Sequence, residues 1–349
     1  MSAPASTGLR FAVLCNRENG SPKVLGQTLT AFLERAGHQA TLSYELKAIR
    51  RLLDGREAKV FSPAWGIYRA ARAAHDARLL SRLREMDAIV LCGTTPRMFH
   101  RHACGVERLR ELLHPIPVIY YSVQYLGNAP SLVERLERKG EPGVERFEHH
   151  WAVSPVTEIR GAPGENWTPI GLHLESVGLR PEPKPAPFAV VDFARKGFEA
   201  HRALQVRALE AAGVPYLSLE RRYSMAAIRD IYRRASLFFL QFPESFGMPI
   251  AECLATGTRI LTPDASWPMA WRLDAEPRPG GGGRLGAGFT VYEGFEELVQ
   301  VLRAHEEEFD PEATPRRVFS SFERDYPGFF RGDLARLREA IGRLPVSVR

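Results

Sequence analysis

The fold is decided by the stretch Glu244-Ser245-Phe246-Gly247-Met248-Pro249-Ile250-Ala251-Glu252, in which two acidic residues flank a Phe-Gly-x-Pro turn. The run 237–242 before it is apolar nearly throughout, which predicts a strand covered on both faces. The segment 249–255 after it is predicted to be a helix that Gly257 ends. Such a strand-turn-helix unit brings both acidic side chains and a row of backbone N–H groups to the carboxyl edge of a parallel sheet, where open α/β sheets hold their ligands.

The same alternation of short apolar runs and helix-length segments extends over the whole chain. Strands are predicted at 11–15, 39–44, 87–92, 117–121 and 151–153, and again at 188–191, 215–219, 237–242, 259–262 and 289–292. Helices are predicted at 24–36, 49–86 with a break near Ser62-Pro63, 106–113, 198–212, 225–235, 249–255, 295–305 and 332–344. This alternation is typical of βαβ units, so we expect the α/β class with parallel sheets.

Two domains are expected from the length of 349 residues and from a change in composition near the middle. The Pro-rich run 180–187 is typical of a semi-rigid connector. We therefore expect a first domain over 1–175 and a second over 188–325.

The composition is typical of a soluble globular protein, with 44% apolar and 25% charged residues. No uncharged apolar run reaches about 18 residues, the length of a spanning helix. The N-terminus lacks the pattern of a secretory signal, so a cytoplasmic location is expected. The four cysteines form no Cys-x-x-Cys pair, which favours free thiols in a reducing compartment.

The net charge of +6 favours an anionic partner, which leaves nucleotide diphosphates, acidic lipids and nucleic acid open. The segments 49–53 and 65–69 mix basic with large apolar residues, which suggests peripheral contact with an anionic membrane, at its inner face. The Arg-rich segment 69–84 raises nucleic-acid binding as a further alternative. Its Ala and Leu spacing is typical of a packed helix without base-stacking aromatics, so no nucleic-acid partner is expected.

The turn in the opening stretch has the chemistry of an anion site. Pro249 suits the first helical position, and the N–H groups around it lack intrahelical partners. Gly247 lets a phosphate approach the backbone closely. Glu252, about one turn into the helix, can accept hydrogen bonds from two adjacent hydroxyls, as on a ribose, and Glu244 is placed nearer the reacting group. The alternative is that both are ordinary surface acids.

The pattern Glu244-x-Phe-Gly-x-Pro-x-x-Glu252-x-x-Ala-x-Gly257-Thr-x-Ile-Leu resembles the signature of retaining glycosyltransferases of the two-domain GT-B fold, especially glycosyltransferase family 4. The helix-like segment 225–236 is similar to the one that precedes this signature in the family. Arg195-Lys196-Gly197 resembles the family's Lys-Gly turn, and 287–302 resembles its last strand and helix. The resemblance covers about 188–303 well and the first half only in layout.

The resemblance implies two Rossmann-like domains facing a central cleft, with the segment 326–349 returning to the first domain. It implies that Glu252 holds the ribose of a nucleotide-sugar donor and that Glu244 faces the donor sugar. It assigns donor contacts to the backbone of Phe246, Gly247 and Met248, and to the turn at Gly20 and Ser21. It also implies that Lys196, with Arg195, neutralises the leaving diphosphate, a role that suits a preorganised cation.

The acceptor side departs from the family pattern, because the strand end that carries a His in many members has none here. Tyr121, Ser122 and Gln124 are the polar candidates at that place. Histidines from other loops are the alternatives: His100, His102, His149 and His150. No general base is assigned, since enzymes of this type are thought to let the leaving phosphate accept the proton.

The predicted function is therefore that of a retaining, metal-independent hexosyltransferase or related glycosyltransferase, with a nucleotide-diphosphate sugar as donor and no cofactor. The acceptor is a hydroxyl of a glycan, a lipid-linked molecule or a small molecule, as in polysaccharide biosynthesis. No Asp-x-Asp pair or zinc-type Cys/His cluster is present in the sequence. A sugar-nucleotide epimerase, a phosphorylase or an inactive donor-binding subunit of the same fold stays open as the alternative.

Overall fold

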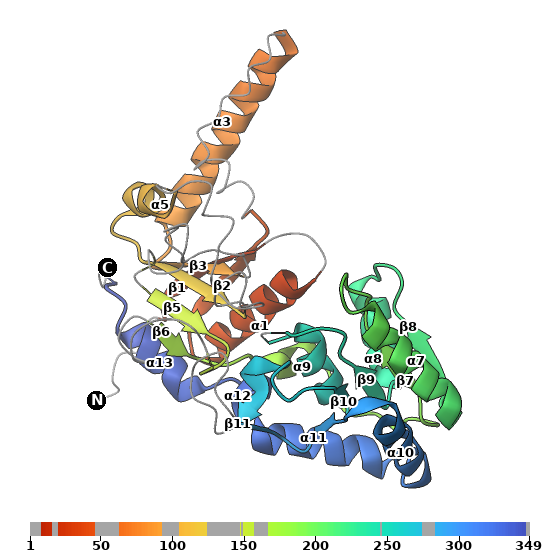
Figure 1. The fold of residues 1–349 in the computed structure, drawn as a ribbon. Helices are drawn as coiled ribbons and strands as arrows, with labels where there is room; N and C mark the ends of the chain where they lie inside the picture. The colour runs from red at the N-terminus through yellow and green to blue at the C-terminus, as the bar shows by residue number, and fades with distance from the viewer. Residues whose placement is uncertain are drawn as a thin grey trace, which may run out of the picture.

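The protein contains two parallel sheets that lie side by side, which confirms the predicted α/β class (Figure 1). The computed structural model describes residues 8–15, 20–45, 63–92, 105–123, 147, 149–156, 167–244, 246–273 and 283–346. Each sheet forms the centre of a Rossmann-like domain, with helices packed on its faces.

The first sheet has six strands in the order β2-β1-β3-β4-β5-β6, all parallel. Its strands are β1 (Arg10–Leu14), β2 (Gln39–Ser43), β3 (Ala88–Cys92), β4 (Val118–Ser122), β5 (His149–Ala152) and β6 (Trp167–Pro169). Its helices are α1 (Ser21–Arg35), α3 (Pro63–Arg84) and α5 (Gly105–Leu113). Every residue of β3 and β4 is buried, as their unbroken apolar sequences require in a sheet covered on both faces.

The second sheet has five parallel strands in the order β13-β10-β9-β7-β8. Its strands are β7 (Ala189–Val191), β8 (Tyr216–Ser218), β9 (Leu237–Phe239), β10 (Arg259–Thr262) and β13 (Phe289–Val291), and β11 (Arg272–Leu273) pairs apart with β12 (Arg284–Leu285). The helices are α7 (Glu199–Ala212), α8 (Met225–Arg234), α9 (Met248–Ala255) and α10 (Gly294–Glu307), with a 3-10 turn, η3 (Met269–Trp271).

The chain returns to the first domain after α10. The turn η2 (Leu174–Val177) leads into the second domain, and α11 (Ala313–Asp325), α12 (Pro327–Phe330) and α13 (Leu334–Gly342) lead back. The Leu172 N–H donates to Gly328 O at 2.8 Å, and the Asp333 N–H donates to Ile170 O at 2.8 Å. Gly332 has φ +69°, and a Cβ there would lie 2.4 Å from the Phe32 ring, so only glycine lets this segment pass so close to α1.

Several elements differ from the sequence prediction. The strand predicted at 151–153 was expected to be the last of the first sheet, but β6 follows it. Strand β6 was missed because its three residues are too few to show a periodicity. Strand β9 ends at Phe239 instead of Phe242, because the chain then turns away toward α9. Helix α11 was not predicted. The first half of the predicted loop 277–288, residues 277–282, lies outside the described residues, and the second half contains β12.

The Pro-rich connector contains a fully buried lysine, which composition alone did not reveal. Lys184 Nζ donates to Arg233 O at 2.7 Å, at the end of α8, and lies 3.3 Å from Thr258 Oγ1. A lysine at a helix C-terminus suits the free carbonyls and the helix dipole there. Burial nevertheless lowers the pKa of Lys184 from 10.5 to about 8. The connector is therefore fastened to the second domain by its only lysine.

This buried amine makes the stability pH-dependent. Between pH 8 and 10.5 the unfolded chain holds a proton on Lys184 that the folded protein has released, so this group raises the free energy of unfolding as the pH rises, by up to about 3 kcal/mol. Urea unfolding at pH 7.5 and pH 10 should show this rise in the wild type relative to Lys184→Met. A Lys184→Met variant with the same pH dependence as the wild type would contradict the assignment.

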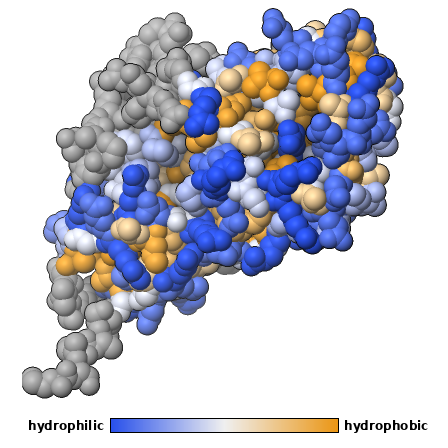
Figure 2. Space-filling view, turned by 90° about the horizontal axis from the view of Figure 1, so that it is seen from below, coloured by the Kyte–Doolittle hydropathy of each residue, from blue (hydrophilic) through white to orange (hydrophobic). Residues whose placement is uncertain are grey.

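The surface is mainly hydrophilic with small apolar patches on the face seen from below (Figure 2). Among the described residues, no helix combines the length and the apolar character needed to cross a bilayer. The predicted membrane contact stays a prediction. Of its two segments, 49–53 lies outside the described residues, and 65–69 belongs to α3, which projects from the first domain (Figure 1).

Candidate functional site

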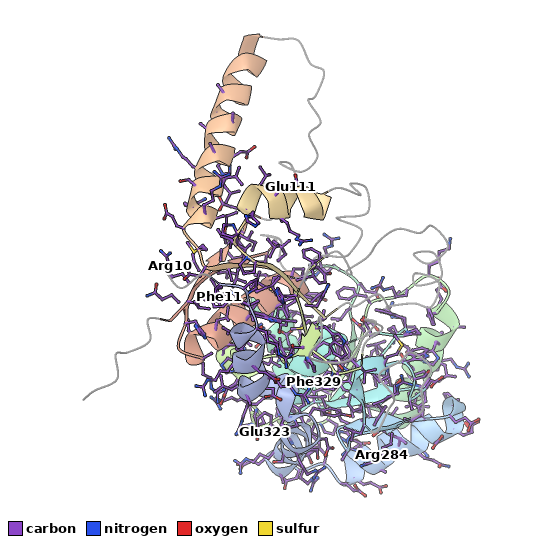
Figure 3. The ribbon with its side chains drawn as sticks, turned by 90° about the vertical axis from the view of Figure 1, so that its left-hand side faces the viewer. Arg10, Phe11, Glu111, Arg284, Glu323 and Phe329 are labelled. Carbon is purple, nitrogen blue, oxygen red and sulfur yellow. The ribbon has the colours of Figure 1, made fainter. Side chains whose placement is uncertain are left out.

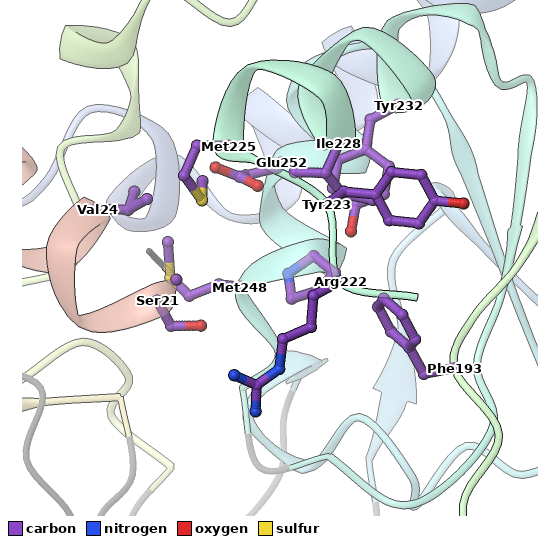
Figure 4. Close-up of a pocket in the computed structure, with 12 residues that line it drawn as sticks. Ser21, Val24, Phe193, Arg222, Tyr223, Met225, Ile228, Tyr232, Met248 and Glu252 are labelled. Atoms are coloured by element: carbon purple, nitrogen blue, oxygen red, sulfur yellow. The ribbon is translucent and has the colours of Figure 1, made fainter. Parts of the chain in front are cut away.

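A pocket of about 710 Å³ lies between the two domains, at the carboxyl edge of the second sheet (Figure 4). This volume is typical of small-molecule sites. The first domain contributes three lining residues from the start of α1, and the second contributes the rest. The lining residues are Gly20, Ser21, Val24, Phe193, Arg222, Tyr223, Met225, Ile228, Tyr232, Met248, Pro249 and Glu252.

One wall of the pocket is the N-terminus of α9, the helix of the two-glutamate stretch. Met248 and Pro249 open this helix and line the pocket. Gly247 precedes them with φ +69°, a conformation that glycine adopts without strain. Among the described residues, no acceptor is found for the N–H groups of Gly247 and Met248. Free N–H groups at the positive end of a helix dipole form an anion-binding position.

The N-terminus of α1 faces the same pocket from the first domain. Gly20 precedes this helix with φ +137°, and Pro22 stands in its first turn. No side-chain hydrogen bond caps the helix, and within the described part of the chain the Ser21 N–H has no acceptor. Two helix N-termini from different domains therefore converge on one pocket, which favours an anionic ligand.

Glu252 is a buried carboxylate in the pocket wall, with 4% of the residue exposed. Arg229 on α8 donates to its Oε1 twice, from Nε at 3.0 Å and from Nη2 at 2.8 Å. Burial raises the pKa of Glu252, and Arg229 opposes this shift. Because both hydrogen bonds fall on one oxygen, Oε2 is left for a ligand hydroxyl, and Figure 4 shows the carboxylate turned toward the side where Met225 and Val24 lie.

Aromatic and cationic side chains form the opposite side of the pocket. The rings of Tyr223 and Phe193 lie on one side in Figure 4, with the Arg222 guanidinium between that side and Ser21. The guanidinium of Arg221 stacks on the Tyr223 ring, 5.6 Å from its centroid. None of the described carboxylates forms an ion pair with Arg222. This side combines flat aromatic faces with a cation available to a ligand.

Glu244 stands beside the pocket lining and faces a second acid that the sequence analysis did not identify. Asp192 follows β7 directly and is buried, and Glu244 follows the neighbouring strand β9. Burial raises the pKa of Glu244 to about 7, with the Asp192 carboxylate raising it further and Arg195 lowering it. Burial likewise raises the pKa of Asp192 to about 6. The backbone of Glu244 is held by Trp267 O at 2.9 Å.

The basic turn predicted to meet the diphosphate lies at the same sheet edge but outside the pocket lining. Arg195 and Lys196 are both exposed. The Arg195 guanidinium stacks on the Phe242 ring, 4.1 Å from its centroid, which keeps it on the Glu244 side. Gly197 closes the turn with φ +91°, and its N–H donates to Glu199 at 2.8 Å.

The acceptor-side candidates are placed differently from the donor-side ones. Tyr121 is buried in β4, and its hydroxyl donates to Gly171 O at 2.7 Å. Ser122 is buried in the same strand, and neither residue lines the pocket. Gln124, His100 and His102 lie outside the described residues. The acceptor role of these residues stays a prediction.

The two described histidine candidates lie on β5 and do not line the pocket. His150 is buried, and one ring nitrogen, Nε2, lies 3.1 Å from Phe147 O. Burial lowers the pKa of His150 to about 4, so it is neutral near pH 7. Burial also lowers the pKa of His149. In the described part of the chain, no three His, Cys, Asp or Glu side chains gather in a way that would hold a metal ion.

Residues from other elements complete the site, and only some of them could be found from the sequence. Asp192 and Phe193 directly follow a predicted strand, as Glu244 does, so the same rule could have identified them. Tyr223 and Arg222 follow β8, where a basic loop that leads into a helix would have the same composition, so their signal is weaker. Arg229 gave no signal, since its partner Glu252 lies 23 residues away on another helix.

Two solved structures are similar to this chain over almost its whole length. One is HepE from Anabaena in complex with UDP-glucose, at 14% identity and a TM-score of 0.50 over 96% of this chain and 99% of that one. The other is the catalytic domain of starch synthase IV from Arabidopsis thaliana bound to ADP and acarbose, at 13% identity and 0.58 over 97% and 99%. No protein-family model and no curated protein matches the chain. Two Rossmann-like domains with a pocket between them, together with these likenesses, give the chain a GT-B-like fold.

Proposed function

We propose that this protein is a glycosyltransferase that binds a nucleotide-diphosphate sugar in the pocket between its domains and transfers the sugar to a hydroxyl. One observation carries the proposal: the buried carboxylate Glu252 lines a pocket on which the N-termini of α1 and α9 converge. A carboxylate recognises paired hydroxyls and helix N-termini recognise phosphates. A nucleoside diphosphate carries both groups a short distance apart.

The binding mode follows from the chemistry of each wall. The free Oε2 of Glu252 accepts hydrogen bonds from the ribose hydroxyls, while Arg229 holds the other oxygen. The Tyr223 and Phe193 rings provide faces for the nucleobase. The diphosphate lies between the N–H groups of Gly247 and Met248 on α9 and the Gly20-Ser21 turn of α1, with the cation of Arg222 beside it. The solved structures hold UDP-glucose and ADP, which are ligands of this class.

The reaction is proposed to proceed with retention at the anomeric carbon and without a metal. The bond from the sugar to the diphosphate breaks, negative charge grows on the leaving diphosphate, and Lys196 and Arg195 stabilise this charge. Glu244 faces the sugar, where its raised pKa of about 7 lets it donate or accept a hydrogen bond near neutral pH. The leaving phosphate takes the proton of the acceptor hydroxyl.

The acceptor approaches from the first domain in this proposal. The proposed acceptor is a hydroxyl of a glycan, a lipid-linked molecule or a small molecule. Contact of the basic segments 49–53 and 65–69 with an anionic membrane would bring the protein to a lipid-linked acceptor. Equal recovery of the protein with neutral and with anionic vesicles would contradict the membrane contact.

A thermal-shift screen tests donor binding directly. UDP, ADP, GDP and their glucose conjugates are compared, and at 100 times the dissociation constant the matching ligand should stabilise the protein by about 2.7 kcal/mol. This corresponds to a rise in melting temperature of roughly 3 to 5 °C. Release of the nucleoside diphosphate on addition of a hydroxyl acceptor would then identify transfer, whereas release of an epimerised sugar nucleotide would identify the alternative. No shift with any nucleotide would contradict the proposal.

A further inference from the structure

The loop before α9 is tied to a buried tryptophan that the predicted signature does not include. Trp271, the last residue of η3, is fully buried and stacks on the Phe246 ring with centroids 5.1 Å apart. Its indole Nε1–H donates to Phe246 O at 2.5 Å. This hydrogen bond joins two segments 25 residues apart, and one of them leads into the pocket.

The bond fixes the direction of the next N–H group. In a trans peptide the C=O and the following N–H lie in one plane and point in opposite directions. The carbonyl of Phe246 points at Trp271, so the Gly247 N–H of the same peptide unit points away from the aromatic side chains. Within the described part of the chain this N–H has no acceptor, and the next two residues, Met248 and Pro249, line the pocket.

Trp271 is itself held in place. The Tyr326 hydroxyl donates to Trp271 O at 2.5 Å and accepts from the Gly286 N–H at 2.7 Å. The Trp271 ring also contacts the rings of Tyr326 and Phe329, with centroids 5.0 and 4.9 Å away. Phe329 belongs to α12 and is labelled in Figure 3. The indole cannot rotate without displacing these neighbours, so the carbonyl of Phe246 keeps its orientation.

We infer that Trp271 is a positioning residue that aims the Gly247 N–H at the diphosphate of the ligand. A preorganised donor costs no reorganisation when the anion binds, and a hydrogen bond to a charged acceptor is among the stronger ones in proteins. Without the indole N–H, the Phe246–Gly247 peptide plane can rotate, because glycine tolerates most backbone conformations. The inference rests on the proposed nucleotide site, since it concerns how that site holds phosphate.

The test compares Trp271→Phe with Phe329→Leu. Trp271→Phe keeps an aromatic ring but removes the N–H, whereas Phe329→Leu loosens the same aromatic packing and leaves the hydrogen bond in place. Calorimetry and ligand-observed NMR measure the affinity for UDP and ADP and for the matching nucleosides, uridine and adenosine. Trp271→Phe should weaken binding of the preferred diphosphate about tenfold and change nucleoside binding less than twofold. Phe329→Leu should leave the ratio of the two affinities unchanged.

A milder variant keeps the inference testable if Trp271→Phe does not fold. Tyr326→Phe removes the hydroxyl that holds the Trp271 carbonyl and should weaken diphosphate binding about threefold, again without weakening the nucleoside. If the wild type binds the diphosphate, two results would overturn the role of Trp271 without affecting the proposed function. One is that the variants lose affinity for diphosphate and nucleoside equally, and the other is that they lose none. A wild type that binds none of these nucleotides would instead overturn the proposed function.

Discussion

Replacing Glu252 with alanine is expected to weaken binding of the preferred nucleoside diphosphate by about 100- to 10,000-fold. The variant loses the hydrogen bonds that the carboxylate offers to both ribose hydroxyls, each worth roughly 1.5 to 3 kcal/mol because the acceptor is charged. It also leaves Arg229 without its partner, which is 2.8 Å away in the wild type. Isothermal titration of purified, folded protein with UDP and ADP measures the loss.

Two further variants separate recognition from folding. Glu252→Gln keeps one side-chain oxygen, which can accept from Arg229, and places an NH2 donor toward the ribose, so its loss should be smaller, about tenfold. Glu220→Ala removes an exposed carboxylate that pairs with Arg202 at 2.7 Å, outside the pocket lining, and should bind like the wild type within a factor of two. A Glu252→Ala variant that binds as tightly as Glu220→Ala would contradict the assigned role.

The stability that Asp192 and Glu244 contribute to the unliganded protein should fall as the pH rises from about 4 to about 7. Buried histidines such as His150 and His305, whose pKa burial lowers to about 4, contribute in the opposite direction, so the effect is measured by comparing variants. The pKa of Glu244 is raised to about 7 and that of Asp192 to about 6, both first by burial, so in this range the folded protein keeps protons that the unfolded chain releases. The contribution of the two carboxyls is therefore complete below their ordinary pKa values and is lost as the pH passes their folded values. The total is on the order of 5 kcal/mol.

Urea unfolding of the wild type at pH 4.5 and pH 7.5, beside the double variant Asp192→Asn/Glu244→Gln, measures this effect. From pH 4.5 to pH 7.5 the stability of the double variant relative to the wild type should rise, and the double variant should be the more stable protein at pH 7.5, since it no longer carries carboxylates at these two positions. Glu296→Gln, on the exposed face of α10, should keep the wild-type dependence. A double variant whose stability changes with pH in the same way as that of the wild type would contradict the contribution of Asp192 and Glu244.

Local patterns in the sequence predicted the fold and singled out five of the twelve residues that line the pocket. The apolar runs define the strands because the parallel sheets bury both faces. The Phe-Gly-x-Pro turn places α9 because Gly247 permits the positive φ of the turn and Pro249 fixes φ at the start of the helix. The residues that complete the site depend on contacts between distant segments. Arg229 reaches Glu252 from another helix, and Trp271 reaches Phe246 from η3. Contacts between such distant segments leave no pattern of residue spacing in the sequence, so they could not be predicted from it.

The Pro-rich connector shows the same limit for stability. Its composition predicts a spacer, yet Lys184 is fully buried and hydrogen-bonded to Arg233 O. Nothing in the Pro-rich sequence around Lys184 indicates that a helix end 49 residues later will cover its side chain. The contacts of the connector with the end of α8 and with Pro311, just before α11, make this lysine interior.

The most direct test of the account is a crystal structure of the protein with the nucleoside diphosphate that gives the largest thermal shift. The account predicts the ribose hydroxyls on Glu252 and the diphosphate between the N-termini of α9 and α1, within hydrogen-bond distance of the Gly247 N–H. A nucleotide bound elsewhere, with the Glu252 carboxylate and the α9 N-terminus free of contacts to it, would contradict the central claim.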